Sequence, residues 1–188
     1  MRLQSGEARR FIASACFVDV VTEGKNAVMR NFIAIALLCA VIGIQPGQAQ
    51  CPAEFIEFFP DPAVPMGTCI HFAMDRKRDW HAAKDYCVAK ASVLAKLDPG
   101  QLHYQVIDYI LGNQAWRDEA FHIGCTDELH EGQWMWVMDN TYVSMGLPHW
   151  LPGQPDGGTA ENYGCLYYPD FMYNSCRNDQ TMYAICMI

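Results

Sequence analysis

The residues with the clearest chemical potential lie in one stretch, residues 150–165, which reads WLPGQPDGGTAENYGC. Three of its side chains, those of Gln154, Asp156 and Glu161, carry hard oxygen donors, and prolines stiffen the chain around them. Calcium prefers carboxylate and amide oxygens of this kind. The stretch therefore predicts a calcium site on a loop.

The loop that carries these donors is unusually long. Residues 140–161 show little periodicity and are rich in glycine and proline. A loop of this length inside a compact domain is usually functional. We therefore expect residues 140–161 to form a binding loop held by the elements on either side of it.

The sequence contains no recognisable catalytic set. Asp127 and Glu128 adjoin each other on an expected turn, where a solvated role is favoured over an acid–base pair. Ser175 lies beside a cysteine with no general base implied. The histidines show no H-E-x-x-H or paired ligand spacing; they are His71, His81, His103, His122, His130 and His149. We therefore predict a binding protein and not an enzyme.

The first fifty residues resemble a targeting region more than a folded domain. The apolar run 31–44 follows Arg30 and precedes small residues, as in a secretory signal peptide cleaved near Ala49 or Gln50. The run falls short of the roughly 20 residues that span a bilayer, although a type II membrane anchor is the alternative. Because residues before Met29 are polar, we expect translation to start at Met29. A secreted protein without membrane insertion follows.

The remainder, residues 51–188, is one domain by length. It contains 8 Lys plus Arg against 18 Asp plus Glu, and the whole chain has a formal net charge of -8. An acidic surface disfavours nucleic acids and anionic membranes as partners. The composition suits a soluble extracellular domain.

Cysteines dominate the expected covalent framework. Seven follow the signal region: Cys51, Cys69, Cys87, Cys125, Cys165, Cys176 and Cys186. In a secreted domain they are expected to form disulfides, but six cysteines allow fifteen pairings and spacing alone does not choose among them. Cys125 is expected to be the buried, unpaired one, and an exposed thiol that dimerises the protein is the alternative.

Periodicity predicts two helices followed by strands, hence an α+β fold. Asp79 is an expected N-cap for the first helix, which places Trp80, Ala83 and Cys87 on one face. The second helix is predicted within residues 101–114, with Gly112 as its C-terminal stop. Its spacing places Leu102, Val106, Tyr109 and Ile110 on one face. Strands are predicted at CIHF, HIGC, QWMWV, YVSM, CLYY and MYAICMI.

Taken together, these motifs resemble the C-type lectin-like domain family over residues 51–188. WHAAKDYC is similar to the family's W-x-x-A-x-x-x-C helix, and HIGCTD stands where the family has W-I-G-L-x-D. EGQWMW, residues 131–136, is similar to the E-G-x-W-x-W strand, and WLPGQPD to the family's ligand loop. The resemblance implies the long form of the fold, two helices with antiparallel sheets. It also implies the pairs Cys87–Cys186, Cys165–Cys176 and Cys51–Cys69.

The resemblance also implies a ligand. The Gln154-Pro155-Asp156 triplet is similar to the galactose-type version of the family's site, in which calcium takes two vicinal sugar hydroxyls into its shell. The peptide before Pro155 would be cis, and Glu161 would join the sugar-binding set. Trp150 is a candidate for stacking on the sugar, with a structural aromatic at the loop base as the alternative. Glycans or glycoproteins are the implied partners, bound through multivalency in a possible oligomer.

One part of the family pattern is absent. Phe171, Met172 and Tyr173 stand where the family has W-N-D, so two oxygen ligands of the calcium site are missing. Asp170 or Asn174 could substitute after a one-residue slip of the strand, although such a slip turns side chains to the other face. With Asn174, the expected metal ligands are Gln154, Asp156, Glu161 and Asn174.

The alternative function needs no calcium. It is a protein-interaction or extracellular-matrix domain that would use an aromatic face formed by Tyr163, Tyr167, Tyr168, Phe171 and Tyr173. Those side chains have an alternative of their own as core and strand-pair residues.

Overall fold

The computed structural model describes residues 51–58, 67–98 and 100–188. The expected signal peptide and the start at Met29 lie outside these residues. In chain order the elements are β1 (Ile56–Phe58), β2 (Thr68–Arg78), α3 (Trp80–Ala89), β3 (Val93–Leu94), α4 (Gly100–Gly112), β4 (Phe121–Thr126), β5 (Met135–Trp136), η2 (Gly158–Ala160), β6 (Tyr163–Leu166), β7 (Tyr173–Cys176) and β8 (Met182–Met187). None of the helices in this part of the chain has the length and apolar character needed to cross a membrane.

Helix α3 forms as predicted. The Asp79 side chain accepts a hydrogen bond from the backbone N–H of Ala82 at 2.8 Å and so caps the first turn. Trp80, Ala83 and Cys87 are its buried residues, which confirms the predicted face. The spacing of three and four residues places these side chains on one stripe, and that stripe packs against β8.

Helix α4 differs from the prediction on its buried face. Val106 and Ile110 are fully buried as expected, but the third buried residue is His103 instead of Leu102. Tyr109 stays 38% exposed, and its ring nevertheless stacks on Phe72 with centroids 5.3 Å apart. A histidine was not expected inside because its ring is polar; here Nε2 donates to the backbone carbonyl of Phe171 at 2.7 Å.

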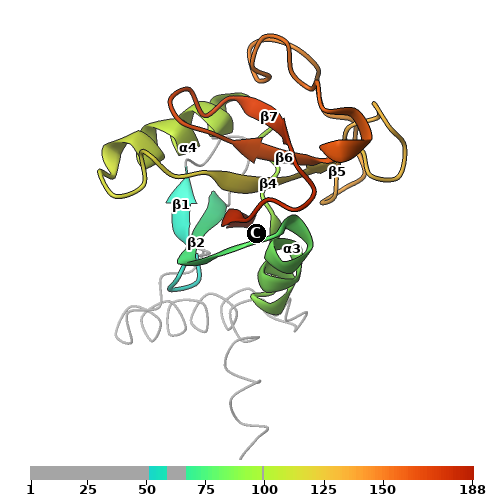
Figure 1. Cartoon of the computed structure of the whole chain (residues 1–188). Coiled ribbons are helices and arrows are strands. Elements are labelled where there is room, and N and C mark those ends of the chain that lie inside the picture. The colour runs from blue at the N-terminus through green and yellow to red at the C-terminus, as the bar shows by residue number, and fades with distance from the viewer. Residues whose placement is uncertain (1–50, 59–66, 99) are drawn as a thin grey trace, which may run out of the picture. The chain divides into compact units, whose positions relative to one another are not determined.

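The strands form one mixed sheet with the order β1-β2-β8-β4-β6-β7 (Figure 1). β4 and β8 run parallel and the other pairs along this order are antiparallel. Two short strands lie off this path, β3 beside β8 and β5 beside β4. The predicted strand YVSM is wrong, because only an isolated bridge between Met135 and Tyr142 forms there. With two helices packed on it, this sheet confirms the α+β class.

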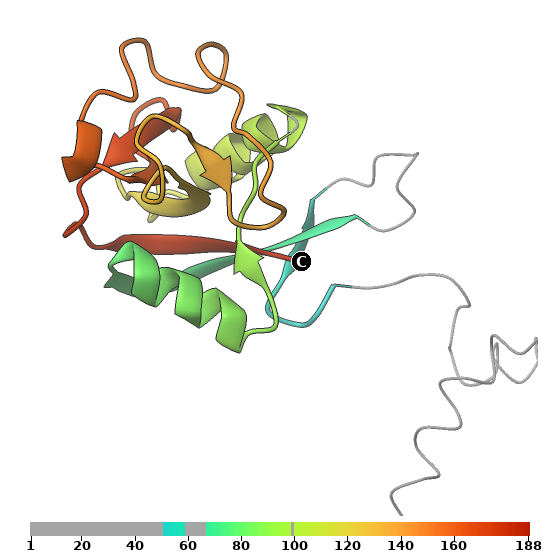
Figure 2. The ribbon, with the colours of Figure 1, turned by 90° about the vertical axis from the view of Figure 1, so that its right-hand side faces the viewer.

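The two edges of the sheet have different roles. Next to the edge strand β1, the backbones of Cys69 and Ile188 exchange two hydrogen bonds, so the beginning of β2 and the residue after β8 lie together. At the other edge the long loop runs beside β7, where Trp150 forms a bridge with Tyr173. In Figure 2 helix α3 lies below the long strands, and the loop 140–161 lies on the other side of them.

The three implied disulfides all form. Cys51–Cys69, Cys87–Cys186 and Cys165–Cys176 have Cα atoms 5.6, 5.4 and 6.2 Å apart. The seventh cysteine, Cys125, is a free thiol that is fully buried. This confirms the expected small buried residue and excludes the alternative of an exposed thiol that dimerises the protein.

The strand that carries Cys125 is covered on both faces. His122 and Cys125 lie three residues apart on β4, so their side chains point to opposite faces, and both are fully buried. His122 Nε2 donates to the backbone carbonyl of Arg78 at 3.1 Å. Burial lowers the pKa of His122 to about 4, so this imidazole is neutral at pH 7. Both residues are therefore structural.

Candidate ligand-binding loop

The long loop is anchored on β7. Residues 140–161 contain no strand or α-helix, only isolated bridges and the short 3-10 turn η2, which agrees with the predicted loop but not with the strand predicted at YVSM. At its base the loop runs beside Tyr173: the N–H of Leu151 donates to the Tyr173 carbonyl at 3.0 Å, and the N–H of Tyr173 donates to the His149 carbonyl at 2.7 Å. The loop thereby extends the edge of the sheet and places residues 154–161 beside the end of β7.

Gln154 binds to β7 through its side chain. Its Oε1 accepts hydrogen bonds from the backbone N–H of Ser175 at 2.8 Å and from the Ser175 hydroxyl at 2.9 Å. The bond between Gln154 and Pro155 is cis, as the resemblance implied. The amide of Gln154 thus takes the place that a neighbouring strand would occupy and fixes the start of the triplet.

Ser175 is the centre of a small polar cluster. Its Oγ also lies 2.8 Å from Glu161 Oε2 and accepts a hydrogen bond from the backbone N–H of Asp156 at 3.3 Å. The Asp156 carboxylate in turn accepts from Gln154 Nε2 at 2.5 Å. Gln154 and Glu161 are half-buried and Asp156 is exposed. Three predicted ligands, which lie up to seven residues apart in the sequence, therefore meet around the buried hydroxyl of Ser175.

A glycine makes room for Glu161. A Cβ atom at Gly157 would collide with Cγ and Cδ of the Glu161 side chain. We therefore expect Gly157→Ala to displace Glu161 and break its hydrogen bond with Ser175, at a cost of about 1 kcal/mol in the free energy of unfolding. Denaturant unfolding measures this loss. Gly112→Ala is the matched control, because a Cβ there meets nothing within 4 Å. Equal stabilities of the two variants would contradict the packing.

Asn174 does not join the cluster, which corrects the predicted metal ligand set. It alternates with Ser175 along β7, so the two side chains point to opposite faces. Asn174 is 9% exposed, and its Nδ2 donates to the backbone carbonyl of Met172 at 2.8 Å. Ser175 is the site residue that the sequence reasoning missed. The search was for carboxylates and amides, and only the register of β7 distinguishes positions 174 and 175.

Trp150 is also corrected as a sugar-binding residue. Its side chain is 0% exposed and packs edge-on against Trp134, with ring centroids 4.9 Å apart. Tyr173 contacts the same ring at 5.8 Å, again edge-on. No face of the indole is left for a sugar. Trp150 is the structural aromatic at the loop base, the alternative role considered for it.

The expected aromatic face is mostly core. Of its five members only Tyr168 is clearly exposed, at 55%, while Tyr163, Phe171 and Tyr173 are buried. The Tyr173 hydroxyl donates to the backbone carbonyl of Leu97 at 2.9 Å, and burial raises its pKa well above the usual value. Aromatic residues in these strands therefore stabilise the sheet instead of forming a continuous binding patch.

The turn after β4 separates its two acidic residues. Glu128 is exposed as predicted, whereas Asp127 is only 4% exposed, which corrects its expected solvated role. Asp127 Oδ2 accepts a hydrogen bond from the backbone N–H of Gly132 at 2.8 Å. Burial is the largest influence on its carboxyl and raises the pKa. Asp127 holds the turn 127–132 closed.

The cluster around Ser175 offers the kind of oxygen ligands that calcium prefers, but fewer of them than calcium usually binds. Gln154, Asp156, Glu161 and Ser175 supply hard oxygens, two of them carboxylates, where calcium ordinarily takes 6–8. Within residues 51–58, 67–98 and 100–188 no group of three or more His, Cys, Asp or Glu side chains is arranged to hold a metal. The residues fit a weak site in which water and ligand hydroxyls complete the shell.

Known proteins share this framework. The family described as "Lectin C-type domain" matches residues 76–188. A perlucin-like protein of Mytilus galloprovincialis is 27% identical over 81% of this chain and 92% of its own length, and a hepatic lectin of Gallus gallus is 34% identical over 64% of this chain and 54% of its own. The carbohydrate-recognition domain of the mouse scavenger receptor C-type lectin has a TM-score of 0.60 and 24% identity, covering 74% of this chain and 98% of that one. The chain belongs to the C-type lectin domain family, and its domain is a binding module without enzymatic activity.

Proposed function

We propose that the chain is an extracellular glycan-binding protein that recognises galactose-type sugars with the help of calcium. The observation that carries this proposal is the convergence of Gln154, Asp156 and Glu161 on Ser175 at the surface of the loop. The names of the relatives support it, since one is a hepatic lectin and a structural neighbour is a carbohydrate-recognition domain. The disulfides suit an extracellular setting.

The side chains of the loop divide the work of recognition. Calcium, when bound through Gln154, Asp156 and Glu161, would supply positive charge that attracts two neighbouring sugar hydroxyls. The Asp156 carboxylate accepts hydrogen bonds from those hydroxyls, and the Gln154 amide both accepts and donates. Because the acid follows the amide, the sugar is oriented as in the galactose-type members that the triplet resembles.

Hydrogen bonds within the chain reduce the cost of binding. Ser175 holds Gln154 and Glu161 in place through two contacts to its hydroxyl. The loop is thus ordered before the ligand arrives, and less conformational entropy is lost on binding. With so few oxygen ligands, calcium affinity falls in the weak range of extracellular modules, Kd about 10⁻⁴–10⁻³ M. Useful binding to a glycan surface then requires several copies acting together.

Affinity chromatography tests the proposal. The full chain, loaded in about 5 mM calcium, a concentration above the weak Kd range, should bind to immobilised galactose more strongly than to immobilised mannose and elute with a chelator. Asp156→Ala should lower retention to background, because it removes a carboxylate that serves both the ion and the sugar. Asp108→Ala, which removes an exposed carboxylate from α4, is the control and should be retained normally.

Two results would count against the proposal. If the chain stays on the column in the presence of the chelator, the sugar is bound without calcium, and the glycan site lies elsewhere on the domain. Passage of the unmodified chain through both columns, together with no rise in Tm on adding calcium, would favour the calcium-independent interaction domain.

A further inference from the structure

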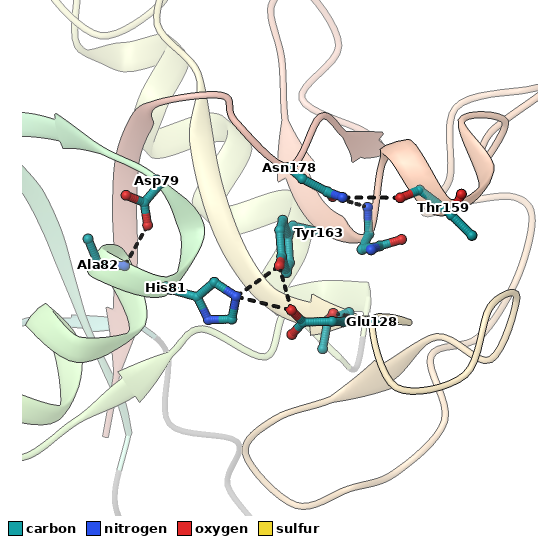
Figure 3. A network of polar contacts seen from close by, with 9 residues as sticks. Asp79, His81, Ala82, Glu128, Thr159, Tyr163 and Asn178 are labelled. Carbon is teal, nitrogen blue, oxygen red and sulfur yellow. Dashed lines mark hydrogen bonds and ion pairs between the residues drawn. The ribbon is translucent and has the colours of Figure 1, made fainter.

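Three side chains outside the loop converge on one point. His81 lies in the first turn of α3, Glu128 in the turn after β4, and Tyr163 at the start of β6 (Figure 3). His81 Nε2 is 2.9 Å from Tyr163 Oη and 3.2 Å from Glu128 Oε1, and Tyr163 Oη is 2.9 Å from the same Glu128 oxygen. The three potential donor atoms therefore form a nearly equilateral triangle.

Of the three residues, Tyr163 is buried and held in place, whereas His81 and Glu128 are accessible to solvent. Tyr163 is 4% exposed, and its ring stacks on Trp80 with centroids 4.7 Å apart. The side chains of His81 and Glu128 are 55% and 40% exposed. Their donor atoms are reachable from solvent, and both side chains have freedom to adjust around the tyrosine oxygen.

The charge at this point is negative and incompletely compensated. In the part of the chain that the structure describes, the Glu128 carboxylate forms no ion pair with Lys or Arg, and His81 is its one ion-pair partner within 4 Å. The Asp79 carboxylate lies close enough to contribute to the field at Tyr163. A cation placed beside His81 and Glu128 would therefore be attracted.

The distances suit a transition-metal ion. Zinc takes nitrogen and oxygen ligands at about 2.0–2.2 Å, and two ligands of a tetrahedral site then lie about 3.3 Å apart. The edges of the triangle, 2.9–3.2 Å, need to open by only a few tenths of an ångström. An ion above its plane reaches all three atoms. A nitrogen ligand favours zinc over calcium, which selects oxygen.

We propose that His81, Glu128 and Tyr163 form a site for a divalent transition-metal ion such as zinc. His81 would bind through the Nε2 lone pair with its proton on Nδ1, and Glu128 through Oε1. Tyr163 would bind through its hydroxyl oxygen, which the stack of its ring on Trp80 holds in place. Water, or a donor from a bound molecule, takes the fourth position. The ion would join α3 to the turn after β4, independently of the long loop.

Calorimetric titration with zinc chloride tests the site. The metal-free full chain is titrated in excess calcium, so that oxygen-only sites are already occupied. We expect one zinc site whose Kd rises about tenfold or more in His81→Gln and Glu128→Gln. Tyr163→Phe, which keeps the stack on Trp80, should weaken binding by a smaller factor. Circular dichroism confirms that each variant is folded.

A matched control separates this site from adventitious histidine binding. His130 is exposed, lies two residues from Glu128 and has no part in the triangle. His130→Gln should leave the zinc Kd unchanged. The proposal is overturned if His81→Gln binds zinc as tightly as the unmodified chain, or if His130→Gln loses the binding instead.

Discussion

Acidification to pH 4 should destabilise the domain by about 6 kcal/mol through two buried histidines. His103 and His122 are fully buried, and burial is the main reason that the pKa of each falls from 6.5 to about 4. Each shift corresponds to about 3 kcal/mol at most. The sum is comparable to the total stability of a typical domain, so unfolding near pH 4 is expected.

The folded domain loses stability as the pH falls because the unfolded chain binds protons more readily than the folded chain. Above pH 6.5 both histidines are neutral in the folded and unfolded chains, and the stability they contribute is complete. Between pH 6.5 and 4 these histidines become protonated in the unfolded chain but stay largely neutral in the folded one, so stability falls as pH falls. Below pH 4 both states are protonated and the loss stops. The exposed carboxylates with lowered pKa, such as Asp139 at about 2, respond only at still lower pH.

The neighbours of His103 explain why its protonation is disruptive. Its Nε2 already donates to the Phe171 carbonyl, so Nδ1 must accept, and it lies 3.2 Å from His149 Nδ1. A proton added on Nδ1 would turn this acceptor into a donor, so His149 would have to change its tautomer to keep the contact. Guanidinium unfolding at pH 7 and 4.5 measures the effect, and His103→Gln should shrink the difference by up to half. A difference unchanged in His103→Gln and His122→Gln would contradict the assignment.

Removal of the Cys87–Cys186 disulfide should cost about 4–5 kcal/mol in the free energy of unfolding. The two cysteines are 99 residues apart in sequence, so the bridge removes much of the conformational entropy of the unfolded chain. Cys87 and Cys186 join α3 to β8 and are fully buried. The paired substitution Cys87→Ala/Cys186→Ala opens the largest covalent loop of the domain.

The Cys165–Cys176 pair provides the matched control. It is equally buried but closes a separation of only 11 residues, so its removal should cost somewhat less than 3 kcal/mol. Urea unfolding of both paired variants under the same conditions gives the difference directly. An equal loss in the two variants would show that packing around the sulfur atoms, and not loop closure, determines the stability.

Local patterns predicted the elements that depend on local forces. Helix α3 follows from Asp79 as a cap and from apolar residues at helical spacing. The long loop follows from prolines and glycines, which disfavour regular structure. The three cysteine pairs and the cis bond before Pro155 followed from resemblance to the family, because spacing alone leaves the pairings open.

Tertiary contacts decided what the patterns left open. The register of β7 depends on Tyr173, whose ring packs in the core and whose hydroxyl donates a hydrogen bond to the backbone carbonyl of Leu97. That position fixes Ser175 toward the loop and Asn174 away from it. Nothing local distinguishes the two registers, because a shift by one residue preserves every strand propensity while exchanging the faces. The burial of His103 and Trp150 likewise depends on partners far away in sequence.

The separation of the two sheet edges has a practical consequence for how the protein is displayed. The backbones of Cys69 and Ile188 meet where β2 pairs with β8, in the half of the sheet that ends at β1, whereas Gln154 and Ser175 lie at the β7 edge. A tether, fluorophore or surface linkage attached after Ile188 should therefore leave the loop unobstructed. Grafting the domain onto beads or a scaffold through its carboxyl end would orient many copies alike, with their loops directed toward an approaching cell.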